Sequence, residues 1–235
     1  MIGAIVAPIP VPCAEDLRRG GARLPEKMTK FLAVHAQNPQ ARLLRQAAQI
    51  LDDGGIAAIP TDSCYALVCH LDDKPAVDRI RRLRRIDERH QLSLLCRDLS
   101  EIAAYARVDN ASYRLLRQAT PGPYTFILQA TREVPRRLSH PSRKTIGIRV
   151  PDHPVALQLL HALGQPVIGS SLQLPGDALP LNDVEEIRAR LDNELDVVLD
   201  AGSCGVEPTT IIDLTTGIPT VVRVGRGALE PLGLA

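Results

Sequence analysis

Short apolar runs alternate with amphipathic helical segments along the chain, and Pro, Gly or a small polar residue closes most of them. Residues 43–51 carry Leu and Ala at helical spacing, and Gly54 and Gly55 end that pattern. Ile56–Ile59 then forms an apolar run of strand length. This alternation predicts an α/β fold in which helices pack against a sheet.

Polar residues at the starts of helical patterns and the later apolar runs predict the remaining elements. The expected helix starts are Asn38 with Pro39, Asp73, Asp98, Asp109, Pro154 and Asn182 with Asp183. The expected strands span residues 56–59, 92–96, 124–129, 145–150, 167–169, 196–199, 209–214 and 219–224. Because strands alternate with helices early and follow one another late, we expect a twisted, mixed parallel and antiparallel open sheet.

The length of 235 residues fits one domain. We interpret residues 1–27 as a flexible N-terminal extension and residues 28–235 as the folded domain. Pro8, Pro10 and Pro12 interrupt the apolar start, which argues against a signal peptide. No run reaches the ~20 apolar residues of a membrane-spanning helix, so we expect no membrane partner.

Cysteine and histidine spacing argues against metal and disulfide sites. The five cysteines include no C-x-x-C pair, and the six histidines include no H-x-x-x-H pair. We therefore expect no metal ligands. An odd number of cysteines without a framework favours free thiols in a reducing cytoplasm.

The net charge is only +1, but arginines gather in residues 79–97 and 132–149. Two such clusters form either a phosphate-attracting face or ordinary solvated surface, and charge alone does not choose between them. Aromatic residues make up 3% and Trp is absent, which argues against stacking platforms for single-stranded nucleic acid.

Common phosphate-binding and nucleophile motifs are absent from the sequence: it has no Walker A loop, no strand-linked G-x-G-x-x-G and no G-x-S-x-G. Several strand ends instead carry hydroxyl residues beside Pro or Gly. Hydroxyls and nearby backbone N–H groups donate to phosphate and carboxylate oxygens, although each such turn alone is typical of ordinary turn chemistry.

The order of these turns is more specific than any one of them. It runs through Pro60-Thr61-Asp62-x-x-Tyr65, Arg84, Pro121-Gly122-x-x-Thr125, Gly147-Ile148-Arg149-Val150-Pro151, Ser170-Ser171, Pro208-Thr209-Thr210 and Arg223-x-Gly225. This order resembles the YrdC-like family, the threonylcarbamoyl-adenylate synthases of tRNA modification, over about residues 36–227.

The resemblance implies a twisted open sheet around a concave, positively charged cavity. It also implies an activity, in which L-threonine, bicarbonate and ATP, assisted by Mg²⁺, give threonylcarbamoyl-AMP and pyrophosphate. The adenylate supplies the t6A modification of tRNA. Many members bind double-stranded RNA, so tRNA or double-stranded RNA is an expected partner beside the nucleotide and L-threonine.

The resemblance also assigns roles to residues. Arg84 and Ser171 match the catalytic positions. The implied substrate and nucleotide contacts are Thr61, Tyr65, Thr125, Arg149, Ser171, Gln173, Thr209, Thr210 and Arg223. A planar, permanently charged guanidinium suits phosphate, which fits Arg149 and Arg223. Tyr65 is expected to be a pocket wall.

Two elements depart from the synthase pattern. The synthases carry Lys-x-Arg where this chain has Arg84-Arg85-Ile86, and Ser-x-Asn where it has Ser171-Leu172-Gln173. Ile86 cannot bind a carboxylate or phosphate, and the loss of one aimed donor raises a barrier by about 2.7–4 kcal/mol. Together with Ala66 in place of a glycine, these changes resemble the YciO branch of the family.

Two functions therefore stay open at this point. The first is an enzyme that makes threonylcarbamoyl-AMP slowly, or that processes this adenylate, for example by hydrolysis. The second is a non-catalytic RNA-binding module with a degenerate synthase pocket, which would recognise duplex RNA mostly by shape and phosphate contacts.

Overall fold

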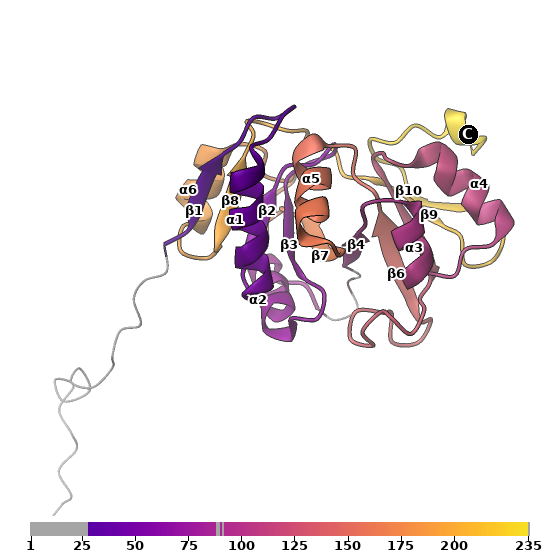
Figure 1. Ribbon diagram of the computed structural model, residues 1–235. Coiled ribbons are helices and arrows are strands. Elements are labelled where there is room, and N and C mark those ends of the chain that lie inside the picture. The colour runs from indigo at the N-terminus through magenta and orange to yellow at the C-terminus, as the bar shows by residue number, and fades with distance from the viewer. Residues whose placement is uncertain (1–27, 88–89, 91, 235) are drawn as a thin grey trace, which may run out of the picture.

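The computed structural model describes residues 28–87, 90 and 92–234, so the predicted extension over residues 1–27 lies outside the described part. The described residues form one ten-stranded sheet with packed helices (Figure 1). Its strand order is β1-β8-β2-β3-β7-β4-β6-β5-β9-β10. The predicted mixed open sheet is confirmed.

Parallel and antiparallel pairs are interspersed across this sheet. Four neighbouring pairs are parallel, namely β1/β8, β2/β8, β4/β6 and β5/β9, and the other five are antiparallel. The strands are β1 Lys30–Ala33, β2 Ile56–Ile59, β3 Ala66–His70, β4 Ser93–Leu95, β5 Tyr124–Gln129, β6 Thr145–Arg149, β7 Val167–Ser171, β8 Val197–Asp200, β9 Thr210–Asp213 and β10 Thr220–Arg223.

The helices of the described chain are α1 Ala41–Asp52, α2 Lys74–Arg84, α3 Leu99–Tyr105, α4 Asn110–Ala119, α5 Pro154–Leu163, α6 Val184–Leu191 and a short 3₁₀ segment, Glu230–Leu232. Within the described ranges, no helix has both the length and the apolar character that crossing a membrane requires.

Aspartate caps begin four of the helices. The carboxylates of Asp73, Asp98, Asp109 and Asp183 each accept a hydrogen bond from a backbone N–H in the first turn, as the sequence predicts. The predicted Asn38 cap of α1 is wrong. That helix begins at Ala41, and its N-cap, Gln40, makes no side-chain capping bond.

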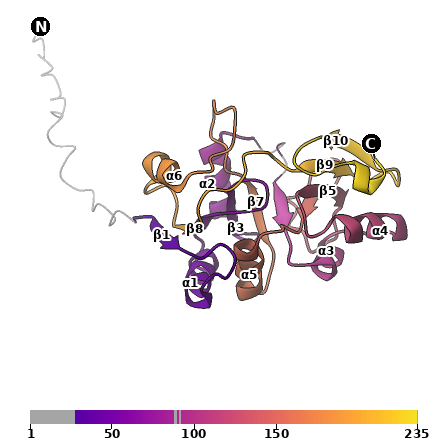
Figure 2. The same cartoon turned by 90° about the horizontal axis from the view of Figure 1, so that it is seen from above.

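Opposite faces of the sheet support two separate hydrophobic clusters. Alternate residues of β2 divide between them, because successive strand side chains point to opposite faces. Ile56 and Ala58 join the cluster beneath α2 and α6, whereas Ala57 and Ile59 join the cluster beneath α1 and α5. Figure 2 shows α1 and α5 on one side of the sheet and α2 and α6 on the other.

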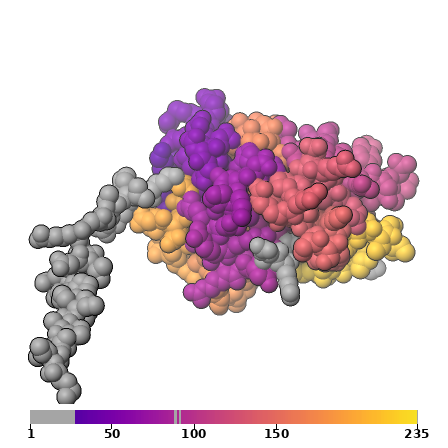
Figure 3. All heavy atoms as spheres, turned by 90° about the horizontal axis from the view of Figure 1, so that it is seen from below, coloured from indigo at the N-terminus to yellow at the C-terminus, as the bar shows by residue number. Residues whose placement is uncertain are grey.

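A long loop over residues 130–144 crosses to the neighbourhood of α2. The Arg137 guanidinium donates to the carbonyl oxygen of Leu71 at 2.9 Å, just before that helix. In the space-filling view of Figure 3, the segments around residues 70–85 and 130–145 lie side by side. This contact ties the loop to the segment between β3 and α2.

Candidate functional site

The turn between β2 and β3 is organised by the hydroxyl of Thr61, which is 1% exposed. Its Oγ1 donates to the carbonyl oxygen of Cys64 at 2.6 Å and accepts from the backbone N–H groups of Ser63 and Cys64 at 3.2 and 3.3 Å. Such a side-chain turn fixes the backbone of residues 61–64. The hydroxyl of Thr61 is therefore committed to the turn, and a ligand contact by Thr61 stays a prediction.

Arg149, from the end of β6, holds this turn from the side. Its Nη1 donates to the Ser63 hydroxyl at 3.1 Å, and its Nη2 pairs with Oδ1 of Asp62. The side chains are buried, with exposed fractions of 7% for Arg149 and 10% for Asp62. The sequence predicts Arg149 as a phosphate contact, but the structure commits both terminal nitrogens to the turn.

Two polar atoms of this ion pair are buried and lack a partner in the described part of the chain. They are Oδ2 of Asp62, an acceptor, and Nε of Arg149, a donor. A buried charged group without all its hydrogen bonds is costly, and each such atom calls for a specific explanation. The pair therefore contains one donor and one acceptor that no described residue satisfies.

Arg84, the last residue of α2, makes the second anchor of the site. Its Nε donates to the carbonyl oxygen of Gln173 at 3.1 Å, and its Nη1 donates to the Ser170 hydroxyl. Burial lowers the pKa of Arg84, and the nearby charge of Arg223 also lowers it. A guanidinium titrates so far above neutrality that Arg84 stays charged.

The serine that contacts Arg84 is Ser170, whereas the resemblance assigns the catalytic position to Ser171. Ser170 pairs in register with Leu67, which lies in the cluster beneath α2, and Ser171 pairs with Ala66, which lies in the cluster beneath α1 and α5. Strand alternation therefore turns Ser170 toward Arg84 and Ser171 toward the other face. The structure therefore does not bring Ser171 to Arg84, and a catalytic role of Ser171 stays a prediction.

The side-chain amide of Gln173 bonds to the backbone of the segment that follows β7. Its amide nitrogen donates to the carbonyl oxygens of Asp177 and Ala178, at 2.9 and 3.4 Å, so the amide folds toward the segment that follows β7. The backbone carbonyl of Gln173, rather than its amide, meets Arg84. A contact of Gln173 with a ligand stays a prediction.

The threonines near the C-terminal strands are buried and bonded to one another and to the backbone. Thr125 and Thr209 share a hydrogen bond of 2.8 Å between their hydroxyls. Thr210 donates to the carbonyl oxygen of Gly227 at 2.6 Å. The bond between Thr125 and Thr209 links β5 to the start of β9, and the bond from Thr210 links β9 to Gly227. Ligand contacts by these three hydroxyls stay predictions.

Arg223 at the end of β10 is exposed, and its guanidinium is oriented by one carbonyl. Nε and Nη2 donate to the oxygen of Thr209 at 3.3 and 2.8 Å. Gly225 allows this close approach, because a Cβ there would lie 2.2 Å from the Pro208 oxygen. Arg223 is thus directed back along β9, and its charge lowers the pKa of Arg84.

Tyr65 lies under the site rather than on its wall. The residue is fully buried, and its hydroxyl donates to the carbonyl oxygen of Gly202 at 2.9 Å. Burial raises the pKa of this hydroxyl. The bond ties the loop over residues 201–208 to the start of β3, so the expected pocket wall is instead a support beneath it.

The same loop reaches the Thr61 turn directly. A Cβ at Gly205 would lie 2.5 Å from the Ser63 carbonyl oxygen, so the two segments touch through a position that suits glycine. Cys64 and Cys204 lie on the two segments in contact. Burial, with a smaller contribution from Cys64, raises the pKa of the Cys204 thiol to about 12, so this thiol is inert at neutral pH.

His90 is a residue near this site that sequence reasoning missed. Burial lowers its pKa, and the charges of Arg84, Arg81 and Arg223 lower it as well. Its carbonyl oxygen accepts a hydrogen bond from Nη1 of Arg81 at 3.3 Å. No sequence pattern marks His90. Asp62 and Ser63 were visible within the strand-end motif, and Ser170 beside Ser171, but none of the three was assigned a role.

The departure at Ile86 has a structural counterpart. Ile86 is partly buried and packs against the larger hydrophobic cluster, so no cation occupies this position. For metals, the described residues contain no group of three or more His, Cys, Asp or Glu side chains that could hold an ion.

Comparison with known proteins adds the family. The family model described as "Telomere recombination", Sua5_yciO_yrdC, matches residues 49–225. Protein YciO of Escherichia coli K12 is 50% identical over 204 residues, covering 87% of this chain and 99% of that protein. The crystal structure of E. coli YciO superposes with a TM-score of 0.84 at 49% identity, covering 87% of this chain and 100% of that chain.

More distant relatives carry an activity in their names. The threonylcarbamoyl-AMP synthase of Halorhodospira halophila is 33% identical over 176 residues, covering 74% of this chain and 91% of that protein. The structure of P. abyssi Sua5 complexed with L-threonine has a TM-score of 0.80 at 24% identity, covering 86% of this chain and 59% of that chain, and so shows the shared fold. The chain belongs to the Sua5/YciO/YrdC family, with YciO among its close relatives and threonylcarbamoyl-AMP synthases among its distant ones.

Proposed function

We propose that this chain binds an adenine nucleotide and L-threonine between the Thr61 turn and Arg84, and that it makes or breaks down threonylcarbamoyl-AMP slowly. One observation carries the proposal: the buried Asp62–Arg149 pair leaves one donor and one acceptor without partners in the described chain. Arg84 and Arg223 supply two further cations, and the charge of Arg223 lowers the pKa of Arg84. Family membership, with a named synthase at 33% identity, supports the same chemistry.

The proposed synthesis has two steps. The threonine amine attacks bicarbonate, water leaves, and a carbamate forms. A carbamate oxygen then attacks the α-phosphorus of ATP, and pyrophosphate leaves, carrying the Mg²⁺ that arrived with the nucleotide. Negative charge builds on phosphoryl oxygens in the second step, so fixed guanidinium groups such as Arg84 and Arg223 stabilise its transition state.

The binding roles follow from the two unpartnered atoms. Oδ2 of Asp62 accepts a hydrogen bond, which suits the amine or hydroxyl of threonine. Nε of Arg149 donates, which suits a carboxylate. Hydrolysis of the finished adenylate would use the same contacts, with water in place of pyrophosphate as the nucleophile.

The reaction is expected to be slow because the second cation of the synthase pattern is absent. Ile86 packs into the hydrophobic cluster and cannot move to the nucleotide without exposing apolar surface. Loss of one aimed donor is worth about a hundred- to a thousandfold in rate. Slow turnover in the cytoplasm, linked to t6A modification of tRNA, is the role that fits.

The absence of the second cation also favours a second candidate, an RNA-binding module that holds nucleotide without turnover. Without the second cation the pocket binds phosphates less strongly, whereas arginines at the end of α2 remain exposed, among them Arg82 and Arg85. Duplex RNA would then be bound by phosphate contacts, with strong dependence on salt.

A turnover assay separates the two candidates. The full chain is mixed with MgATP, L-threonine and bicarbonate, and both pyrophosphate and threonylcarbamoyl-AMP are measured; in a second arm, loss of added threonylcarbamoyl-AMP is compared with its spontaneous decay. We expect turnover in one arm that the Arg84→Gln variant loses, while the exposed control Arg42→Gln retains it. The absence of turnover in both arms, together with salt-sensitive binding of duplex RNA, would select the module.

A further inference from the structure

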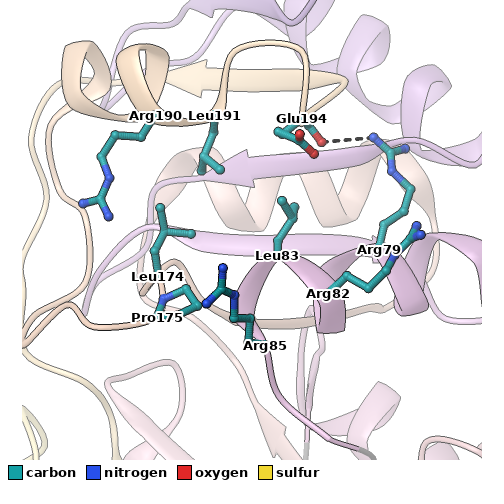
Figure 4. Close-up of a pocket in the computed structure, with 9 residues that line it drawn as sticks. All are labelled: Arg79, Arg82, Leu83, Arg85, Leu174, Pro175, Arg190, Leu191 and Glu194. Atoms are coloured by element: carbon teal, nitrogen blue, oxygen red, sulfur yellow. Dashed lines mark hydrogen bonds between the residues drawn. The ribbon is translucent and has the colours of Figure 1, made fainter. Parts of the chain in front are cut away.

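A groove of about 750 Å³ lies between α2, α6 and the segment that follows β7. We call it the α2–α6 groove; the residues that define it are Arg82, Leu83, Arg85, Leu174, Arg190 and Leu191 (Figure 4). None of these residues belongs to the Thr61–Arg84 site. The groove is therefore a second feature, which the proposed reaction does not use.

Positive charge surrounds the groove, but only part of it is neutralised. Arg79 pairs with Asp196 at 2.8 Å, and Arg190 pairs with Asp177 at 3.0 Å. Arg82 and Arg85 are both exposed, and neither side chain has a hydrogen bond or ion pair with any residue that the structure describes. Two cations at one wall are thus available to a ligand.

The position of Arg85 is unusual for an arginine. It is the C-cap of α2 with a φ of 48°, a left-handed conformation that glycine usually occupies. An L-residue adopts this conformation at an energetic cost. Because glycine would relieve the strain, the presence of arginine here suggests that its charge at the groove has a use.

Apolar side chains form the floor between these charges. Figure 4 shows Leu83, Leu174 and Leu191 directed into the space that the arginines surround. Among the described lining residues, Glu194 is the only carboxylate. The result is an apolar centre inside a cationic rim, which is the usual anatomy of a protein–protein contact patch.

We propose that the α2–α6 groove docks an acidic peptide segment of a partner protein, with leucine-like side chains on the floor and carboxylates on Arg82 and Arg85. The leucine floor decides between a peptide and a nucleic acid. A phosphate backbone would use the arginines but would gain nothing from Leu83, Leu174 and Leu191. A peptide with alternating acidic and apolar residues satisfies both features.

The test measures binding of a short fluorescein-labelled peptide of repeated Glu-Glu-Leu to the full chain by fluorescence anisotropy. We expect saturable binding that the double variant Arg82→Glu, Arg85→Glu weakens by at least about tenfold, because reversed charges repel the carboxylates. The matched control Arg42→Glu, Arg45→Glu reverses two exposed arginines on α1 and is expected to bind like the parent chain. A matched Glu-Glu-Ser peptide should bind more weakly than the Glu-Glu-Leu peptide.

Three results would overturn the proposal. The first is equal affinity of the two double variants, with Arg82→Gln, Arg85→Gln repeating the result if the glutamate variant does not fold. The second is equal binding of the Glu-Glu-Ser peptide, which would remove the role of the leucine floor. The third is tighter binding of a short RNA duplex with the same dependence on Arg82 and Arg85, which would assign the surface to nucleic acid. Threonylcarbamoyl-AMP turnover is measured separately, so its failure would not affect this proposal.

Discussion

Asp62 and Arg149 form a buried ion pair that joins the turn after β2 to the end of β6. Each contributes one buried atom that has no hydrogen-bond partner in the described chain. Removal of one member of a buried pair leaves an uncompensated charge, whereas removal of both does not.

The first prediction concerns this pair. Asp62→Asn or Arg149→Met alone should lower the free energy of unfolding by about 3–5 kcal/mol, because the remaining charge stays buried. The double variant should recover much of that loss. Urea unfolding followed by circular dichroism measures all three variants.

The control for these three variants is an exposed ion pair on α6. Arg188 and Glu185 lie 3.8 Å apart with side chains 47% and 77% exposed. Glu185→Gln should therefore change stability by less than about 1 kcal/mol. A loss for Asp62→Asn no larger than that of the control would contradict the structural role of the buried pair.

The second prediction concerns the departure from the synthase pattern. Restoring that pattern with Arg84→Lys and Ile86→Arg should raise pyrophosphate release, by as much as about a hundredfold if the new guanidinium reaches the nucleotide. The single variant Ile86→Met, which keeps an apolar side chain, serves as the control. An unchanged rate in the double variant would mean that Ile86 does not limit synthesis.

The third prediction concerns Tyr65. Tyr65→Phe removes the hydroxyl that donates to Gly202 and leaves the ring in place, so it should lower stability by about 0.5–1.5 kcal/mol. If the loop over residues 201–208 shapes the site, the KM for threonine should rise more than kcat falls. A loss of kcat alone would instead indicate that the hydroxyl contacts reacting groups.

The fourth prediction is a pH dependence of stability. Burial lowers the pKa of His153 below its ordinary value, and Asp62 and Asp152 only partly oppose this effect. Because the folded pKa is depressed, the stability contribution of His153 is present above its unfolded pKa of about 6.5 and is lost as the pH falls through the folded value. Stability should therefore decrease on acidification through this window.

His153→Asn tests that prediction, since asparagine can still cap α5 through its side-chain oxygen but does not titrate. The urea midpoint of the variant should vary less with pH than that of the parent chain. Burial lowers the pKa of His90 as well, so part of the pH dependence of stability should remain in the His153→Asn variant. A pH profile identical to that of the parent would exclude His153 as a source.

Much of the fold could be predicted from the sequence because its signals are local. Asp73, Asp98 and Asp109 cap helices through bonds to residues three positions away, and such spacing is visible in a sequence. The sequence patterns did not predict strands β1 and β3. Lys30–Ala33 follows the interpreted extension without a strand-like pattern, and Ala66–His70 directly continues the Thr61 turn.

The site could be predicted only in part, because its contacts depend on register and long-range packing. The sequence order points to Arg84 and to a serine of β7, but only the pairing of Leu67 with Ser170 shows which serine faces α2. His90 lies in the loop that follows α2, where its carbonyl oxygen accepts from Arg81, and no periodic pattern reveals this contact.

The central claim is that the region between the Thr61 turn and Arg84 holds an adenine nucleotide. Calorimetric titration of MgATP into the full chain in the presence of L-threonine tests it directly. We predict saturable binding that Arg42→Gln retains and Arg84→Gln weakens by at least about tenfold, since a charge-assisted contact to phosphate is lost. The absence of binding to the parent chain, or equal affinity of the Arg84→Gln variant, would contradict the account.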